Sequence, residues 1–374
     1  MFKKKQWLAV VRGNRWVVAQ VARRKFNLNI LRLSEYRPEP VVADSLESFG
    51  EKALELAEGQ LEEEPLNSAR NSNSLKGWLQ KNHVPVNKLR LAVSCPGVIT
   101  RMITLPLMSV QDLDELLTLH VDQYFTLNIS DYVVDYRVLE RLIEDGEMRQ
   151  RVLLAALPKY QWEKLWAEWE EIGFKPDVVD LAADGLARLY SQLALRGKNQ
   201  GGTDEVDSSL DMAIIELNAD RVEFILLEHG MFFLYSDLEV ALDGLDQITI
   251  AVTAQEGGNG GSEEQHDPEL QTAKLHDWAK TEVETALGSI LHSATEFFNF
   301  FAARHFGKSI DRIYITGDYA DLPFLSEIFE KNLEVLTQVG FPNAWRPSYS
   351  RRIQRLQKNG MKYGSLYGLA FREG

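Results

Sequence analysis

Cysteine is nearly absent from the sequence. Cys95 is the single cysteine among 374 residues, so the chain cannot form an internal disulfide. The start of the sequence has no signal-peptide pattern, which together with the missing disulfides predicts a reducing compartment, the cytoplasm. Cys95 ends an apolar strand pattern and has no partner motif, so we interpret it as a buried structural thiol and not as a nucleophile.

Long apolar stretches and an excess of positive charge are missing as well. No uninterrupted apolar run approaches the ~20 residues of a transmembrane helix, so we expect contact with a membrane only through partners. The 55 acidic residues outnumber the 41 basic ones, and the net charge of -14 opposes attraction to a phosphate backbone. Nucleic acid is therefore excluded as an expected partner. For the lysines at positions 3–5, a solvated terminus is favoured over contact with anionic lipid.

The sequence does have enough apolar residues for large cores, and its patterns follow a clear order. An apolar fraction of 45% in a chain of this length predicts a folded protein with two main lobes. The first segment predicts three strands separated by turns at 12–14 and 25–27. Two helical patterns follow, at 46–57 and 75–79, with a polar loop between them at 62–74. A strand pattern comes next, at 89–96.

A different order of strand, helix, strand, strand and helix begins at Ile99. The strand ITRMITLP ends at Pro106, and Ser109 with Asp112 three residues later predicts the start of a helix. Two strands and a helix follow in the segments DYVVDYRVL, RVLLAALP and QWEKLWAEWEEIGFKP. Gly173 is expected to end that helix. Its tryptophans recur at helical spacing, which favours a core stripe over a binding surface.

The last part of the chain repeats the opening pattern. Residues 198–209 predict a polar linker, and the segment DMAIIELNADRVEF predicts two strands joined by the turn 217–220. A third strand follows a turn at 228–230. The Gly-rich acidic stretch at 254–269 is expected to be a loop, since it lacks the lysine of a phosphate-binding loop. One long helix, a strand, a helix and a C-terminal helix complete the chain, in the segments 283–301, IDRIYITG, PFLSEIFEKNL and KYGSLYGLAF.

These segments carry a resemblance to the PilM family of cytoplasmic type IV pilus assembly proteins, which is related to FtsA. The inserted subdomain of that family is similar to ITRMITLPLMSVQDLDELLTLHVDQYF followed by DYVVDYRVL, and to RVLLAALPKYQWEKLWAEWEEIGFKPDVVDLAADGLARLY. The strand, glycine turn and helix beside its adenosine pocket are similar to IDRIYITGDYADLPFLSEIFEKNL, and its closing helix to YGSLYGLAFR. The resemblance covers most of the chain and is strongest over residues 99–190.

The resemblance implies an α/β protein with the actin-like ATPase fold. Such a protein has two lobes of mixed sheets flanked by helices, with an inserted βαββα subdomain in the first lobe. The implied boundaries are 1–98 for the start of the first lobe, 99–175 for the inserted subdomain, 176–197 for the return to the first lobe, 198–209 for the linker, and 210–374 for the second lobe with a degenerate insertion around 237–283.

The resemblance also locates a nucleotide site, at which these residues depart from the family pattern. A nucleotide-binding member begins with an Asp-x-Gly turn, whereas VVRGNRWVV has no acidic residue there. In the second hairpin Glu216 is available to a metal, but Asn218 places a side chain where the backbone must approach phosphate. Asp318 adds negative charge beside a bound anion. The residues that would contact ATP with magnesium, if any is bound, are Gly13, Asn14, Glu216, Asn218, Gly317 and Asp318.

Because these features are lost, we expect no bound cofactor, no catalytic or metal-ligating residue, and no ATP turnover. ATP with magnesium stays open as the alternative. Glu216 is more simply explained as a charged turn residue, and Gly317 as a structural turn.

The resemblance implies an adaptor and not an enzyme. A PilM-type protein captures the N-terminal cytoplasmic tail of the inner-membrane protein PilN and couples the pilus motor to the assembly platform, at the inner face of the cytoplasmic membrane. We expect the tail to lie extended in a groove between the first lobe and the inserted subdomain. The residues predicted to contact it are Arg101, Leu105, Pro106, Met108, Leu117, His120 and Tyr124. A homo-oligomer, an ATP-binding actin-like ATPase and a pseudo-ATPase of a type II secretion-like platform are the alternatives.

Overall fold

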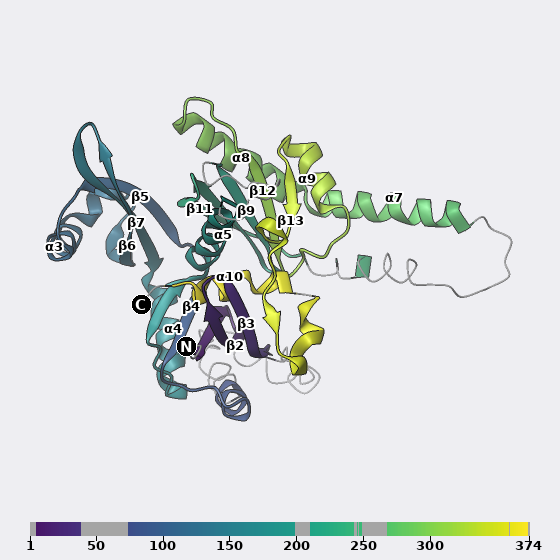
Figure 1. The fold of residues 1–374 in the computed structure, drawn as a ribbon, viewed down its shortest axis with the longest axis horizontal. Helices are drawn as coiled ribbons and strands as arrows, with labels where there is room; N and C mark the ends of the chain where they lie inside the picture. The colour runs from purple at the N-terminus through teal and green to yellow at the C-terminus, as the bar shows by residue number, and fades with distance from the viewer. Residues whose placement is uncertain are drawn as a thin grey trace, which may run out of the picture.

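Two lobes and a smaller third unit are each built on their own β-sheet (Figure 1). The computed structural model describes residues 5–38, 74–198, 210–242, 245, 247–248, 268–358 and 360–372. The first-lobe sheet has the strand order β14-β3-β2-β1-β4-β8, the second-lobe sheet β11-β10-β9-β12-β13, and the third sheet β5-β7-β6. The first lobe is at the bottom of Figure 1, the second lobe at the top, and the third sheet projects to the left.

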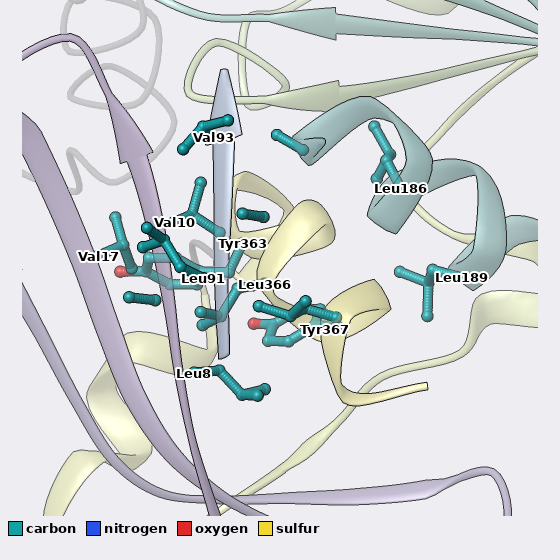
Figure 2. Close-up of a cluster of buried hydrophobic side chains, with 14 of the residues drawn as sticks. Leu8, Val10, Val17, Leu91, Val93, Leu186, Leu189, Tyr363, Leu366 and Tyr367 are labelled. Carbon is teal, nitrogen blue, oxygen red and sulfur yellow. The ribbon is translucent and has the colours of Figure 1, made fainter. Parts of the chain in front are cut away.

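The first-lobe sheet begins with the predicted meander. Its strands are β1 (Lys5–Arg12), β2 (Arg15–Arg24), β3 (Asn27–Tyr36), β4 (Leu89–Ser94) and β8 (Val178–Leu181). β1 pairs antiparallel with β2 and parallel with β4, so it lies in the middle of the sheet. Leu8, Val10 and Leu91 lie in one apolar cluster with Leu186 and Leu366 from helices that cover the sheet (Figure 2). Burial of such side chains is the main stabilising term of the lobe.

The third unit is inserted between β4 and β8. It contains β5 (Ile99–Pro106), α3 (Val110–His120), β6 (Tyr132–Glu144) and β7 (Glu147–Pro158). The predicted helix start is confirmed, because the Ser109 side chain accepts a hydrogen bond from the Asp112 amide at 3.2 Å. Its apolar residues form a separate core, so the unit folds around its own centre.

Helix α4 (Lys159–Ile172) contacts both the first lobe and the inserted unit, since its buried residues share one apolar cluster with the first lobe and with Leu153 and Leu157 of β7. Trp169 is 1% exposed and meets the edge of Phe174, whose ring in turn packs against Trp16 of β2. The boundary expected at 175 lies just after this helix and before β8. The core interpretation of the tryptophan stripe holds for Trp169, whereas Trp166 is 44% exposed.

The second lobe repeats the hairpin order of the first. Its strands are β9 (Met212–Leu217), β10 (Arg221–Glu228), β11 (Met231–Glu239), β12 (Arg312–Gly317) and β13 (Thr337–Val339). Its helices are α7 (Pro268–Ala286), α8 (Gly288–Arg304) and α9 (Leu325–Leu333). The single long helix expected over 283–301 is wrong, since α7 ends and α8 begins around Leu287 and Gly288, and glycine is a common site of helix kinks. In Figure 1 α7 extends sideways, away from both lobes.

The end of the chain returns to the first lobe, which corrects its assignment to a second lobe over 210–374. After η3 (Pro342–Ala344) come β14 (Ser348–Tyr349), η4 (Arg351–Gln357), η5 (Gly360–Tyr363) and α10 (Gly364–Ala370). β14 pairs parallel with β3. Helix α10 crosses α5 (Ala182–Lys198) so closely that a Cβ on Gly368 would lie 1.6 Å from the Gly185 carbonyl oxygen. Glycine is therefore required where these two helices cross.

Several expectations fall on residues outside the described part of the chain. They are the helix at 46–57, the loop at 62–74 apart from its last residue, the linker at 198–209 apart from its first residue, and the Gly-rich stretch at 254–269 before Pro268. Residues 243–244, 246 and 249–267 of the expected insertion at 237–283 lie outside it too.

Candidate functional site

The two hairpin turns that the sequence singled out meet between the lobes. Gly13 and Asn14 of the β1–β2 turn and Asn218 of the β9–β10 turn line one pocket of about 110 Å³. Ser94 and Lys164 line it as well. The structure thus brings together three of the six predicted nucleotide contacts.

Arg12 of the first lobe reaches Glu216 of the second lobe, the carboxylate that the sequence suggested as a possible metal ligand. Its side chain is 9% exposed and forms an ion pair with Glu216, which is fully buried. Its Nη2 also donates to Ser365 Oγ at 3.2 Å. A fixed guanidinium from the chain therefore supplies the positive charge that faces Glu216.

Arg15, on the other side of the same turn, makes a second bridge between the lobes. Its Nη2 donates to Asp318 Oδ1 at 2.9 Å and to Glu35 Oε2 at 3.3 Å. Glu35 is also paired with Lys362 Nζ at 2.7 Å and accepts a hydrogen bond from Tyr363. Burial alone would raise the pKa of Glu35, but Lys362, Tyr363 and Arg15 together lower that pKa to about 2.

A second buried carboxylate lies beside Glu216. Glu223 is opposite Glu216 in the β9–β10 register and is 1% exposed. It accepts hydrogen bonds from Ser94 Oγ at 3.1 Å and from Tyr235 Oη at 2.9 Å. Burial raises the pKa of Glu216 to about 8 despite the opposing charge of Arg12, and Glu223 adds to the rise. One guanidinium can neutralise only one of the two carboxylates, so the pair favours retention of a proton near neutral pH.

Gly317 and Asn218 have structural roles at this junction. Gly317 has φ +106°, and a Cβ there would lie 2.4 Å from the Leu217 carbonyl oxygen. Asn218 is 2% exposed, and its backbone amide donates to the Arg221 carbonyl oxygen at 3.0 Å. The glycine thus permits β12 to end against the backbone of β9, which is the structural turn that the sequence favoured.

These residues do not fit a magnesium nucleotide in the arrangement observed. Pockets that hold ligands of that size are typically about 300–1,000 Å³, whereas this one is about 110 Å³. The predicted contacts Glu216 and Asp318 do not line this pocket, and both are already paired, with Arg12 and Arg15 respectively. Across the described residues, no group of three or more His, Cys, Asp or Glu side chains is placed to hold a metal ion.

A larger groove lies where the inserted unit meets both lobes. It has a volume of about 330 Å³. Residues from β6, α5 and the β10–β11 turn line it: Arg137, Leu139, Ala187, Arg188, Ser191, Gln192, His229, Gly230, Met231 and Phe232. The groove therefore lies between the first lobe and the inserted unit, with the second lobe as a third wall.

Ion pairs hold the walls of this groove in place. Asp184 of α5 is buried and pairs with both Arg137 of β6 and Arg188 of α5. Arg188 also pairs with Asp180 at 3.1 Å. Burial raises the pKa of Asp184, and the two arginines oppose that rise. The Arg137–Asp184 pair thus attaches the inserted unit to the first lobe.

Two of the seven predicted partner contacts belong to the core of the inserted unit. Leu105 and Leu117 are each 7% exposed and lie in one apolar cluster with Leu113 and Val152. A side chain that is needed in the core has no surface to offer to a peptide. We therefore remove both from the predicted contact set.

The other five residues lie together on β5, α3 and the short helix η1 (Val121–Tyr124), but none of them lines the groove. Pro106 and His120 are exposed, and Arg101, Met108 and Tyr124 are half-buried. Arg101 Nε donates to the Tyr124 carbonyl oxygen at 3.1 Å, so part of its role is to fix η1.

Sequence reasoning missed the groove residues because they come from three segments that are distant in the chain. One signal was present in the strict alternation of DYVVDYRVL, which places Arg137 and Leu139 on the same face of β6. No local pattern connected that face to α5 or to the turn at His229.

Comparison with known proteins identifies the family. A family model described as type IV pilus assembly protein PilM matches residues 45–374. The chain belongs to this family. No curated protein sequence matches it. Within the described residues, no helix has both the length and the apolar character needed to cross a bilayer.

A solved structure shows the same fold. A structure described as the PilM-PilN type IV pilus biogenesis complex aligns with a TM-score of 0.65 at 17% identity, covering 99% of both chains. MreB5 of Spiroplasma citri bound to AMPPNP aligns with a TM-score of 0.41 at 9% identity, covering 98% of this chain and 95% of that one. The cytoplasmic domain of EpsL from the Vibrio cholerae type II secretion system aligns with a TM-score of 0.37 at 7% identity, covering 99% and 96%. The PilM-family chain has the actin-like ATPase fold expected from its sequence.

Proposed function

We propose that this PilM-family protein is a cytoplasmic adaptor that binds the N-terminal tail of a PilN-type membrane protein and does not turn over ATP. The observation that carries the proposal is the family match over residues 45–374. Membership in a pilus assembly family is supported further by a similar structure described as a PilM-PilN complex. In this role the protein works at the inner face of the membrane, next to the platform and motor proteins of the pilus.

The groove between the three units has the chemistry of a peptide site. Leu139, Met231 and Phe232 give it apolar surface, while Arg137 and Arg188 bring guanidinium groups to its wall. Apolar pockets with a few polar groups suit a short extended peptide, whose side chains alternate between the pocket and the solvent. We propose this groove as the main tail site, and the surface that carries Arg101 and Tyr124 as the alternative.

A peptide titration distinguishes the two surfaces. A labelled peptide with the PilN tail sequence is titrated, with anisotropy as the readout, against Leu139→Asp and Met231→Asp in the groove and against Arg101→Ala and Tyr124→Ala on the other surface. We expect each groove variant to weaken binding by more than about 1 kcal/mol, because it places a charge against the apolar face of the peptide. Ile143→Asp, at a side chain that is 72% exposed and outside the groove, is the matched control.

The outcomes are separable. Loss of binding only in Arg101→Ala and Tyr124→Ala would show that the tail binds at the β5–α3 surface and not in the groove. Unchanged affinity in all four variants, with unchanged melting temperatures, would rule out both sites. If the intact protein shows no binding at all, the adaptor proposal itself fails.

The proposal that ATP is not turned over rests on the ion pairs in the cleft. Arg12 and Arg15 pair with the carboxylates that a magnesium nucleotide would need, and the space between the two turns is small. An ATPase of this fold needs a free carboxylate for the metal and a cradle of backbone amides for the phosphates. Here the charges are already neutralised within the protein.

A further inference from the structure

A segment near the C-terminus concentrates positive charge in an acidic protein. Residues 335–372 contain no Asp or Glu, although the whole chain carries a net charge of -14. The basic residues in this segment are Arg346, Arg351, Arg352, Arg355, Lys358, Lys362 and Arg372. Lys362 and Arg372 are paired with Glu35 and Asp180, and the other five are exposed.

The fold places this segment beside another cation on β3. Ser350 follows β14, and its amide donates to the Ile30 carbonyl oxygen at 2.9 Å. Its hydroxyl donates to the Leu31 carbonyl oxygen at 3.0 Å. Arg351 follows Ser350 and Arg32 follows Leu31, so the two arginines share one edge of the first-lobe sheet.

The β2–β3 turn contributes two more cations at the same edge. Trp345 Nε1 donates to the Phe26 carbonyl oxygen at 3.2 Å, which holds Arg346 next to this turn. The turn also carries Arg24 and Lys25, both exposed. We call the resulting surface the basic face, defined as Arg24, Lys25, Arg32, Arg346, Arg351, Arg352, Arg355 and Lys358.

The cations of the basic face are directed to solvent. In η4 the half-buried Ile353 and Leu356 pack against the first-lobe core, which leaves Arg351, Arg352 and Arg355 exposed. None of the eight cations of the basic face forms an ion pair with a described residue, whereas arginines elsewhere, such as Arg188, are paired. Their charge is therefore not neutralised within the described part of the protein.

We propose that the basic face is a docking surface for a membrane leaflet rich in anionic phospholipid headgroups. Clusters of about 4–8 Lys and Arg bind such leaflets, each cation contributing about 1 kcal/mol near the surface. The strongly acidic remainder of the protein is repelled by the same leaflet, so the two effects together fix one orientation.

Other macromolecules fit the basic face less well. Among the described residues, none of the exposed large hydrophobic side chains belongs to it, so it lacks the apolar centre of a protein interface. Of the aromatic rings next to it, Phe341 and Trp345 are buried, and Phe26 and Tyr349 are half-buried and pack against the first-lobe core, so none presents a fully exposed ring on which bases could stack. A pocket of about 140 Å³ is lined by Arg346 and Lys358, but the other six cations lie outside it. A charge spread over a broad surface matches the spread charge of a lipid leaflet.

Vesicle co-sedimentation of the full chain, without PilN, tests the proposal. The vesicles are an equal mixture of phosphatidylglycerol and phosphatidylcholine, or phosphatidylcholine alone. We expect binding to the mixed vesicles only, and loss of that binding at high salt. The triple variant Arg351→Glu, Arg352→Glu and Arg355→Glu should lower the partition coefficient at least about a hundredfold.

A second triple variant is the control. Arg141→Glu, Lys159→Glu and Arg304→Glu change the net charge equally, at exposed cations on other elements that have no ion pair with a described residue. It should lose much less binding than the triple variant in η4, and both should keep the wild-type melting temperature. Equal losses in the two variants, absence of binding to the mixed vesicles, or binding to an acidic peptide or RNA instead would overturn the proposal. Because PilN is absent, none of these outcomes depends on tail capture.

Discussion

Arg12 determines the chemistry of the cleft at the scale of single residues. Glu216 pairs with it directly, and the second buried carboxylate, Glu223, lies next to Glu216 on the adjacent strand. These neighbours raise the pKa of Arg12 above its ordinary value even though burial opposes the charge. A buried ion pair of this kind is costly to break from one side, because the remaining charge is left without a partner.

We therefore expect Arg12→Ala to lower the free energy of unfolding by about 3–5 kcal/mol above pH 8, where Glu216 with its pKa of about 8 is ionised. The double variant Arg12→Met with Glu216→Gln removes both charges at similar volume, and it should recover most of that loss. Urea denaturation of the three proteins measures both effects. A cost below about 1 kcal/mol for Arg12→Ala would show that the cleft is hydrated and that the pair is not a structural bridge.

The raised pKa of Glu216 predicts a dependence of stability on pH. A carboxyl whose pKa rises from 4.5 to about 8 on folding stabilises the folded state below pH 4.5, and this contribution is lost as the pH rises toward 8. The free energy of unfolding of the wild type should fall between pH 5 and pH 8, and that of the Glu216→Gln variant should fall less. Denaturation at several pH values measures the two slopes. Identical slopes would show that Glu216 is ionised throughout this range.

At the scale of elements, helix α4 carries both a buried tryptophan and an exposed one. Trp169 is 1% exposed and contacts Phe174, whereas Trp166 is 44% exposed and donates from Nε1 to Glu170 at 2.9 Å. Trp169→Ala should cost about 3–5 kcal/mol through the cavity it leaves. Trp166→Ala should cost less than about 1 kcal/mol. Chemical denaturation gives both values, and similar costs would mean that the whole stripe is buried in solution.

Elements with local signals were predictable from the sequence. Ser109 caps α3 through an amide three residues away, and the strand pairs beside the turns at Gly13 and Asn218 follow from alternating apolar residues. The break between α7 and α8 was missed because the apolar spacing continues through Leu287, and only the change in direction separates the two helices.

Elements placed by distant contacts could not be predicted. The return of α10 to the first lobe depends on the close crossing of Gly368 over Gly185, which no local pattern encodes. The Arg12–Glu216 pair joins residues 204 positions apart. The sequence shows that the first turn lacks an acidic residue. No local pattern in it shows that the neighbouring Arg12 reaches the second lobe.

At the scale of the whole molecule, the lobes are joined by their own side chains. Arg12 with Glu216, Arg15 with Asp318 and Ser94 with Glu223 each connect one lobe to the other. In a nucleotide-dependent machine the ligand makes such connections, and its release allows the lobes to move. Here the connections are part of the chain, so we expect the two lobes to keep this arrangement without a ligand.

This arrangement predicts that magnesium and ATP have little effect on the protein. A ligand at a hundred times its dissociation constant stabilises a fold by about 2.7 kcal/mol, which would raise the melting temperature by several degrees. We expect millimolar Mg-ATP to shift the wild-type melting temperature by no more than about 1 °C, and phosphate release to stay at background. Glu216→Ala is the control for turnover, because any activity that vanishes in it would come from this cleft. A shift of several degrees, or phosphate release that depends on Glu216, would mean that the ion pairs between the lobes open to admit a nucleotide and that the protein changes conformation when it binds one.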